Sequence, residues 1–166
     1  MAMALEEAKA AARDGEAPVG AVVVVDGEVV ARARNRREMD RDPTAHAELL
    51  AVREAAERLG RWRLAGATVY VTLEPCPMCA GALILARVDR IVFGAYDPKA
   101  GACGSVVDLF EAGRFNHRPE IVGGVMAEAC GRVLTEFFEG RRKRGQLKVK
   151  ISGSLGTGNR ASVALR

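Results

Sequence analysis

The sequence is poor in aromatic residues and in cysteine, and it has no long apolar run. Aromatic side chains make up 5% of the 166 residues, which argues against a surface that stacks many single-stranded bases. Four cysteines are too few for a secreted disulfide scaffold of this length. No apolar stretch approaches the roughly 20 residues that cross a bilayer, and the N-terminal residues lack the order of a signal peptide. We therefore expect a cytoplasmic protein without a membrane span.

What the sequence does contain is the composition of an ordinary globular domain. Hydrophobic residues make up 49% and charged residues 28%, which excludes a mainly disordered chain. A chain of this length buries enough core to stay folded without a disulfide or a metal. We find no internal repeat, and we expect one domain over residues 1–145. Residues 146–166 are basic and then rich in glycine and serine, which predicts a loosely ordered tail.

The positive charge is concentrated near the C-terminus. Residues 139–150 hold six basic residues against one acidic residue, a net charge of +5, which leaves −1 for the rest of a chain whose total is +4. A second group of arginines, over residues 32–41, is diluted by neighbouring acidic residues. Localised positive charge suits contact with phosphates, although it also suits a solvated helix end at the negative pole of the helix dipole.

Local patterns predict a hairpin followed by helices that alternate with strands. A first helix over 5–13 precedes a β-branched run over 19–25. Asp26-Gly27 joins this run, as a hairpin turn, to Val29-Val30 and an alternating Ala/Arg stretch that ends at Arg34. The further elements expected are helices at 45–59, 77–87 and 127–144, and strands at 68–73, 90–93 and 120–122. This order predicts an α/β fold of three layers, α/β/α, with a mixed central β-sheet.

Two short segments, each at a predicted helix start, carry the residues that point to chemistry. His46-Ala47-Glu48 opens one helix, and Pro75-Cys76-Pro77-Met78-Cys79 opens another. Cys76 and Cys79 share one helix face near its positive end, which favours the thiolate form. Two thiolates and one imidazole suit zinc, and three protein ligands leave a tetrahedral zinc one open position for water. The pattern therefore indicates a catalytic rather than a structural zinc site.

Glu48 is interpreted as a proton-transfer residue beside the metal rather than as a fourth ligand. The residues alone leave two alternatives open. The first is a redox pair of the thioredoxin kind, formed by the two motif cysteines. The second is a structural zinc site, whose fourth ligand would come from Cys103, Cys130 or His117. The occurrence of both motifs in one small domain favours the catalytic interpretation.

The two motifs together resemble the signature of the zinc nucleobase deaminases, His-x-Glu followed by Pro-Cys-x-x-Cys. Residues 42–48, 70–76 and 78–82 are similar to the bacterial tRNA-specific adenosine deaminase family in particular. Shorter segments that match the same family are Pro18-Val19-Gly20-Ala21, Val92-Phe93-Gly94-Ala95, Asn116-His117-Arg118, and Phe137-Phe138 followed by Arg141-Arg142. The resemblance spans roughly residues 5–144.

The resemblance implies a cytidine deaminase-like fold and hydrolytic conversion of adenosine to inosine at the wobble position of a tRNA anticodon. It implies one zinc ion per subunit, held by His46, Cys76 and Cys79. Glu48 would take a proton from the attacking water, pass it to the ring and protonate the departing ammonia. The implied partners are the tRNA anticodon stem-loop and a second copy of the chain, with no organic cofactor and no membrane.

The same resemblance implies which residues contact RNA. Asn35 would hydrogen-bond the flipped base, and Arg141 and Arg142 would meet the backbone. The residues on loops that would contact the anticodon nucleotides are Asp97, Lys99, Asn116 and His117. From the sequence alone, Asn35 and Asp97 also suit turns, and His117 suits an exposed surface. Two other functions remain alternatives: deamination of a free base or nucleoside such as guanine or cytidine, and RNA binding by a zinc-stabilised module without catalysis.

Overall fold

The computed structural model describes the backbone of residues 1–112 and 115–154, and the side chains of residues 1–111 and 115–143. Five strands form one sheet in the order β2-β1-β3-β4-β5. Their bounds are β1 Gly20–Val25, β2 Glu28–Arg34, β3 Ala67–Leu73, β4 Arg90–Ala95 and β5 Glu120–Val122. The helices are α1 Ala2–Arg13, α2 Arg37–Asp40, α3 Ala47–Leu59, α4 Pro77–Leu85, α5 Leu109–Ala112 and α6 Ala127–Ser154.

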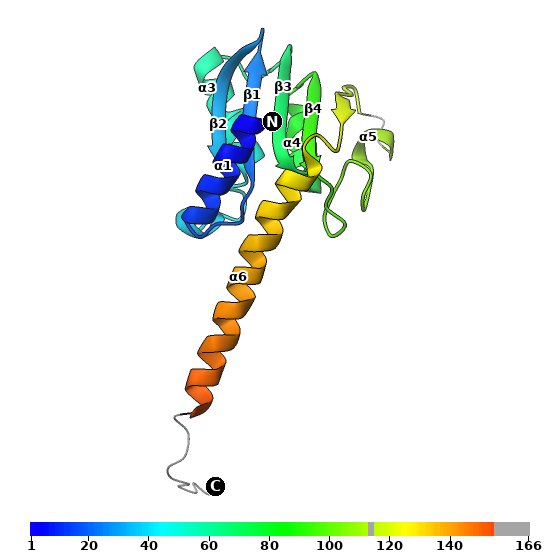
Figure 1. Ribbon diagram of the computed structural model, residues 1–166. Helices are drawn as coiled ribbons and strands as arrows, with labels where there is room; N and C mark the ends of the chain where they lie inside the picture. Colours follow the sequence, from blue (N-terminus) through cyan, green and yellow to red (C-terminus); the bar gives the residue numbers. More distant parts are fainter. Residues whose placement is uncertain (113–114, 155–166) are drawn as a thin grey trace, which may run out of the picture.

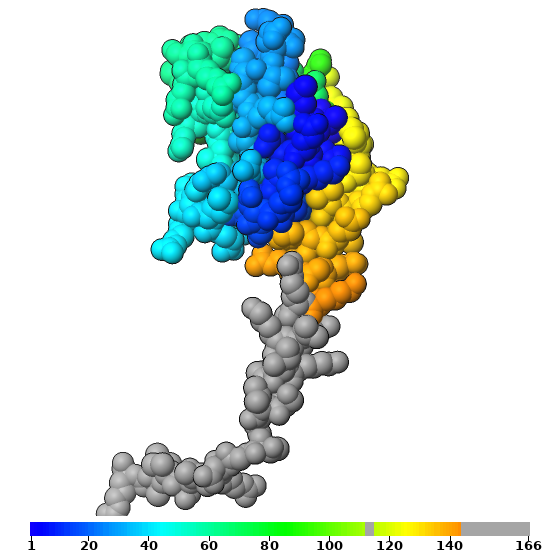
Figure 2. Space-filling model, turned by 60° about the vertical axis from the view of Figure 1, so that its left-hand side comes forward, coloured from blue at the N-terminus to red at the C-terminus, as the bar shows by residue number. Residues whose placement is uncertain are grey.

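The helices cover the sheet on both faces. Helices α1 and α6 contact each other on one face, and α3 and α4 contact each other on the opposite face (Figure 1). The space-filling view shows the dark blue α1 packed beside the first, yellow and orange, turns of α6 (Figure 2). This arrangement is the α/β/α fold with a mixed sheet that the sequence predicts. In the part of the chain that is described, no helix is long and apolar enough to cross a membrane.

The strand directions decide where loops meet. Strand β1 is antiparallel to β2 and to β3, whereas β3, β4 and β5 are parallel to one another. The start of β1 therefore lies at the same edge as the ends of β2, β3 and β4. Residues that follow these three strands are brought together although they are far apart in the chain. We call this edge the carboxyl edge.

The larger part of the core lies between the sheet and the layer of α3 and α4. Ala47, Ala51 and Ala55 are fully buried on one face of α3, and their small size lets the helix lie close to the β-branched residues of β1 and β3. On the other face the sheet is also tightly packed. A Cβ atom at Gly20 would overlap the backbone of Ala4 in α1, so glycine is required there for the close approach of helix and strand.

The predicted elements are all present, with differences at their ends. Helix α4 ends at Leu85, two residues early, and Arg87 follows with a φ of 61°. Helices α2 and α5 were not predicted, because four residues are too few to show a helical period. Helix α6 continues ten residues beyond its predicted end. It thereby extends into residues 146–154 of the segment for which we expect a loosely ordered tail; residues 155–166 lie outside the described part, and the loose tail stays a prediction.

Candidate active site

A pocket of about 230 Å³ opens at the carboxyl edge of the sheet. It is lined by residues from the ends of three strands and from the segments before α3 and α4. Five of the residues singled out in the sequence line it together, namely Asn35, His46, Glu48, Cys76 and Asp97. Cys79 lies directly behind, fully buried in the first turn of α4. Arg37 and Glu74 also line the pocket and were not anticipated.

Backbone hydrogen bonds hold the histidine segment against the end of β2. The N–H of Arg36 donates to the carbonyl of Ala45 at 3.0 Å, which closes the loop that carries α2. Within this loop, Asp42 Oδ1 accepts hydrogen bonds from the N–H and the hydroxyl of Thr44, both at 2.7 Å. His46 is the extended residue that precedes α3, so its side chain leans back from the helix start into the pocket.

The three predicted metal ligands come together with the spacing that a tetrahedral ion requires. His46 Nδ1 lies 3.7 Å from Cys76 Sγ and 3.5 Å from Cys79 Sγ. All three ligand atoms lie within 4.8 Å of one another. Nitrogen and sulfur ligands at ordinary zinc distances are about 3.6 Å apart in a tetrahedral site. The donor set therefore fits zinc in both chemistry and spacing.

The charge state of the two cysteines also suits a cation. The pKa of Cys76 falls to about 4, because the Cys79 thiol donates a hydrogen bond to its sulfur and His46 adds a second one. That same hydrogen bond, together with burial, raises the pKa of Cys79. Cys76 also precedes α4, where the helix dipole favours negative charge. The surroundings of Cys76 thus favour its thiolate form, which is the form that binds a metal.

Glu48 lies in the first turn of α3 and is 4% exposed. Its Oε2 atom is the one buried side-chain nitrogen or oxygen in the described part of the chain that has no hydrogen-bond partner. Burial raises the pKa of this carboxyl group. A buried polar atom without a partner costs stability, and such atoms are rare unless they serve a function. Glu48 lines the pocket, where a bound ligand can supply the missing partner.

Asn35 follows β2 and is 5% exposed. Its N–H donates to the carbonyl of Val19 at 3.0 Å, which holds it at the carboxyl edge. Its side-chain nitrogen donates to Glu16 at 2.9 Å. Asn35 thus directly follows a strand and lines the pocket, which is the position that a base-binding residue needs.

The loop after β4 forms the opposite wall, and Glu74 holds it in place. Glu74 is buried and accepts hydrogen bonds from the N–H groups of Asp97, Cys103 and Ser105 at 2.9 to 3.1 Å. The Ser105 hydroxyl donates to it as well. Burial alone would raise the pKa of Glu74, but these hydrogen bonds together lower it. In the sequence, the position of Glu74 directly before the Pro-Cys motif is the signal that places it near the site.

A second, larger hollow of about 540 Å³ adjoins the first and shares Asp97, Val19 and Leu73 with it. It lies between the carboxyl edge and α6, and Lys99, Arg142, Tyr96 and Phe138 contribute to its lining. We call this hollow the α6 groove. Arg141 is exposed, and its guanidinium group lies 5.6 Å from the centre of the Phe137 ring. Three of the predicted RNA-contacting residues thus surround one continuous depression: Asp97, Lys99 and Arg142.

Asn116 and His117 are not brought to this edge. They precede β5, whose first residue pairs with Arg90 at the start of β4, so they lie at the opposite end of the parallel strands. Asn116 Oδ1 accepts a hydrogen bond from Arg87 at 2.5 Å, and His117 Nε2 lies 2.6 Å from the carbonyl oxygen of Val88. Both contacts stabilise the loop before β5. A role for these two residues in RNA binding stays a prediction.

The other two cysteines do not join the metal ligands. Among the described residues, the His46, Cys76 and Cys79 cluster is the one group with metal-binding spacing. Cys130 is buried in α6 against Ala95 and Leu5. Cys103 is half-buried, and burial raises the pKa of its thiol to about 12. A structural site completed by Cys103, Cys130 or His117 is therefore not what the fold assembles.

Comparison with known proteins gives a consistent result. Residues 1–142 match a family model described as MafB19-like deaminase. The chain is 54% identical over 144 residues to the tRNA-specific adenosine deaminase of Bacillus subtilis, which covers 87% of this chain and 89% of the relative. A solved structure from a study of A-to-I editing by tRNA deaminases at the wobble position of transfer RNA has a TM-score of 0.79 and 46% identity, over 81% of this chain and 97% of that one.

A guanine deaminase from Bacillus subtilis is also similar, with a TM-score of 0.56 and 31% identity over 84% of this chain and 89% of that one. The fold is thus shared within a wider group of deaminases, while the tRNA-specific relatives have the higher identity. The family and the fold predicted from the sequence are confirmed. With a family match over residues 1–142 and this degree of identity, the chain belongs to the deaminase family, among the tRNA-specific adenosine deaminases.

Proposed function

We propose that this chain hydrolyses adenosine to inosine and ammonia at the wobble position of a tRNA anticodon. One observation carries the proposal: Glu48, with its unpartnered oxygen, faces the same pocket as the His46 and Cys76 donor atoms. The relatives described above are named for tRNA, and their similarity extends over nearly the whole chain, which supports tRNA as the substrate. A tRNA substrate also implies that the enzyme works in the cytoplasm.

We infer that the metal is zinc, with one ion per subunit held by His46, Cys76 and Cys79. Sulfur and imidazole donors support zinc over calcium or magnesium, which prefer oxygen ligands. The chemistry that zinc supplies in such a site is activation of water as a nucleophile at neutral pH. Elemental analysis of the purified protein tests the assignment, and a protein that is active without zinc contradicts it.

Glu48 moves the protons in this proposal. Its Oε2 atom accepts a proton from the water that attacks C6 of adenine, and it delivers that proton to the ring nitrogen. The second proton of the water goes by the same oxygen to the amino group. The C6–N bond then breaks and ammonia leaves, so the base has gained an oxygen and lost its amine. The open oxygen is what this role needs, because a carboxylate already saturated with hydrogen bonds is a poor acceptor.

The shape of the site supports a base that is turned out of its strand. The inner pocket, about 230 Å³, is large enough for one base and too narrow for a duplex. Asn35 lines its side, and the α6 groove continues from its mouth. Lys99 and Arg142 in that groove offer positive charge to the neighbouring phosphates. The anticodon stem-loop supplies both features, an unpaired base and flanking phosphates.

We also infer a homodimer. Helix α4 exposes apolar side chains, with Leu85 70% and Met78 38% exposed. The loop that hydrogen-bonds to the start of this helix exposes Val106 and Val107. Apolar side chains exposed on a helix and on the loop bonded to its start are typical of a surface that a partner covers. Light scattering on the purified protein tests this inference, and a monomer at micromolar concentration contradicts it.

The decisive experiment measures inosine in an anticodon stem-loop that carries adenosine at the wobble position, with free adenosine, guanine and cytidine in parallel. We expect turnover of the stem-loop alone, and we expect it to fall steeply as salt rises because phosphate contacts are screened. The second candidate is a free-base deaminase, which the similarity to guanine deaminase favours. Turnover of guanine that does not respond to salt would support that candidate and contradict the tRNA proposal.

A further inference from the structure

A carboxylate that the proposed chemistry does not use is buried behind the pocket. Glu16 lies in the segment between α1 and β1, and it is 1% exposed. No described lysine, arginine or histidine forms an ion pair with it. Arg36 interacts with Glu16 electrostatically without a direct ion pair, and burying a carboxylate that lacks such a pair costs stability unless hydrogen bonds compensate. The atoms that supply those hydrogen bonds therefore show what the group does.

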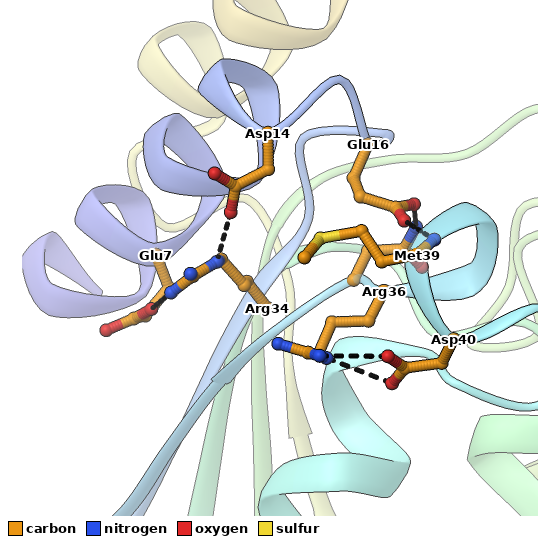
Figure 3. Close-up of polar contacts among 8 residues, drawn as sticks. Glu7, Asp14, Glu16, Arg34, Arg36, Met39 and Asp40 are labelled. Atoms are coloured by element: carbon orange, nitrogen blue, oxygen red, sulfur yellow. Dashed lines mark hydrogen bonds and ion pairs between the residues drawn. The ribbon is translucent and has the colours of Figure 1, made fainter.

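Two donors reach Glu16, one for each oxygen. The backbone N–H of Met39, in α2, donates to Oε1 at 2.7 Å, and Figure 3 shows these two residues side by side. The side-chain nitrogen of Asn35 donates to Oε2 at 2.9 Å. Glu16 thus joins the segment after α1 to the loop that carries Asn35, and Asn35 is the pocket-lining residue to which its side chain is hydrogen-bonded.

The bond from Asn35 determines which way its amide points. A carboxylate accepts hydrogen bonds and does not donate them, so the atom of Asn35 that faces Glu16 has to be the nitrogen. The amide oxygen is then on the other side. Among the described residues none is hydrogen-bonded to that oxygen. If it were also fully buried, it would count with Glu48 Oε2 as a buried atom without a partner, and it does not, so it is not fully buried. Since Asn35 lines the pocket, its Oδ1 is accessible there.

We propose that Glu16 is a positioning residue that holds the Asn35 amide with its oxygen toward the bound base. The assignment of the base to a wobble adenosine rests on the proposed function. Without Glu16, the Asn35 amide can reverse and present two N–H donors where it now presents an acceptor. A base whose N–H group donates to Asn35 Oδ1 would then face the N–H groups of the reversed amide. The lost binding free energy would equal that of a buried polar group left without a partner. Glu16 acts in this way on recognition without touching the substrate.

The test is a double-mutant cycle with Glu16→Gln and Asn35→Ala. The glutamine side chain keeps the shape of Glu16, but it has a single acceptor oxygen and cannot accept from both the Met39 N–H and Asn35. We expect E16Q to lower kcat/KM on the stem-loop by about tenfold or more, because misplaced contacts with the substrate are costly. In the N35A background the same change should have no further effect, because Glu16 acts through Asn35.

Glu7→Gln is the matched control. Glu7 also lies on the α1 side of the molecule, and it binds Arg32 and Arg34 away from the pocket. We expect E7Q to leave kcat/KM unchanged. The proposal is overturned if E16Q keeps wild-type kcat/KM. It is equally overturned if E16Q costs the same factor with and without Asn35, since Glu16 would then act only through the stability of the fold.

A second measurement does not depend on activity. Asn35→Asp would face Glu16 with another carboxylate, and we expect this variant to melt at a lower temperature than wild type. Adding E16Q restores one amide and one carboxylate, so the double variant should regain much of the lost melting temperature. Absence of that rescue contradicts the contact itself. If instead the wild-type protein does not deaminate the stem-loop, the tRNA proposal fails. The melting-temperature rescue, and the double-mutant cycle measured on whichever base the protein does deaminate, still decide the role of Glu16.

Discussion

Two buried carboxylates at the carboxyl edge are surrounded in opposite ways. Glu74, in the loop after β3, accepts hydrogen bonds from three backbone N–H groups and from the Ser105 hydroxyl. Glu48, at the start of α3, leaves one oxygen without a partner. Hydrogen bonds lower the pKa of Glu74 despite its burial, whereas burial raises the pKa of Glu48. The comparison separates a carboxylate that holds the wall of the site from one whose open oxygen suits the proton transfer that we propose.

The saturated carboxylate shapes one wall of the pocket. A Cβ atom at Gly101 would overlap the Glu74 carboxylate, so the loop after β4 wraps closely around this side chain. Asp97 and Lys99, at the start of that loop, are thereby held beside the pocket and the α6 groove. The unsaturated carboxylate contributes no comparable contact to the fold. Substitutions at the two positions should therefore affect different measurements.

The largest effect on catalysis is expected for Glu48→Ala. Turnover should fall by at least about a thousandfold, because the proton-transfer group is lost. Zinc content and tRNA binding should stay at wild-type levels, and the melting temperature should not fall, because a buried polar atom without a partner has been removed. Single-turnover inosine formation, elemental analysis and thermal melting check these outcomes. Loss of zinc in this variant would mean that Glu48 is a ligand.

The largest effect on stability is expected for Glu74→Gln. The amide keeps the size of the side chain but has one acceptor oxygen for four donors, so some buried donors lose their partners. We expect the free energy of unfolding to fall by about 2–3 kcal/mol. Denaturant unfolding measures it. If Glu74→Gln is as stable as wild type, the hydrogen bonds of Glu74 do not stabilise the fold, and Glu74 and Glu48 do not differ in this respect.

The pH dependence of stability sharpens the same comparison. Because the folded protein holds the pKa of Glu74 below its ordinary value of 4.5, the group stabilises the fold fully above that pH. Its contribution is lost as the pH falls through the lower value of the folded state. The difference in unfolding free energy between wild type and Glu74→Gln should thus be largest near neutral pH and shrink in acid. Urea unfolding from about pH 7 to about pH 3 tests this, and a difference that grows in acid contradicts it.

A smaller effect is expected for Arg142→Ala in the α6 groove. Removing one exposed phosphate contact should raise KM for the stem-loop several-fold and leave kcat nearly unchanged. The dependence of kcat/KM on salt should also become less steep, by about one unit in the double-logarithmic slope. Arg63→Ala is a suitable control, because Arg63 lies over Trp62 away from the groove. Equal salt slopes in wild type and R142A would exclude Arg142 from phosphate contact.

Most of the fold could be predicted because its elements are set by local patterns. The β-branched run before Asp26-Gly27 and the alternation after it become the antiparallel pair β1 and β2. The Pro-rich start of α4 and the turn at Asp42 also follow from residue type. The single-turn helix α2 could not be predicted in this way, since it depends on the loop closure between Arg36 and Ala45.

The candidate site was predictable where its residues lie in short motifs. His46 and Glu48 are two positions apart, and Cys76 and Cys79 are three positions apart. These short spacings indicate a metal site with a neighbouring carboxylate. Nothing local marks Arg37 or Glu16 as neighbours of the pocket. Conversely, Asn116-His117 looks like part of the site in the sequence, yet the parallel pairing of β5 with β4 places it at the far end of the strands.

The sequence by itself determined the alternation of strands and helices, a donor set that suits zinc, and the family. These depend on residue type at short range, where side-chain chemistry and hydrophobic period act directly. Only the tertiary structure decided which carboxylates are saturated and which one is open, and which way the Asn35 amide points. Those properties depend on atoms that strand pairing brings together from distant parts of the chain. A hydrogen bond between such atoms does not produce a recognisable spacing of residues in the sequence.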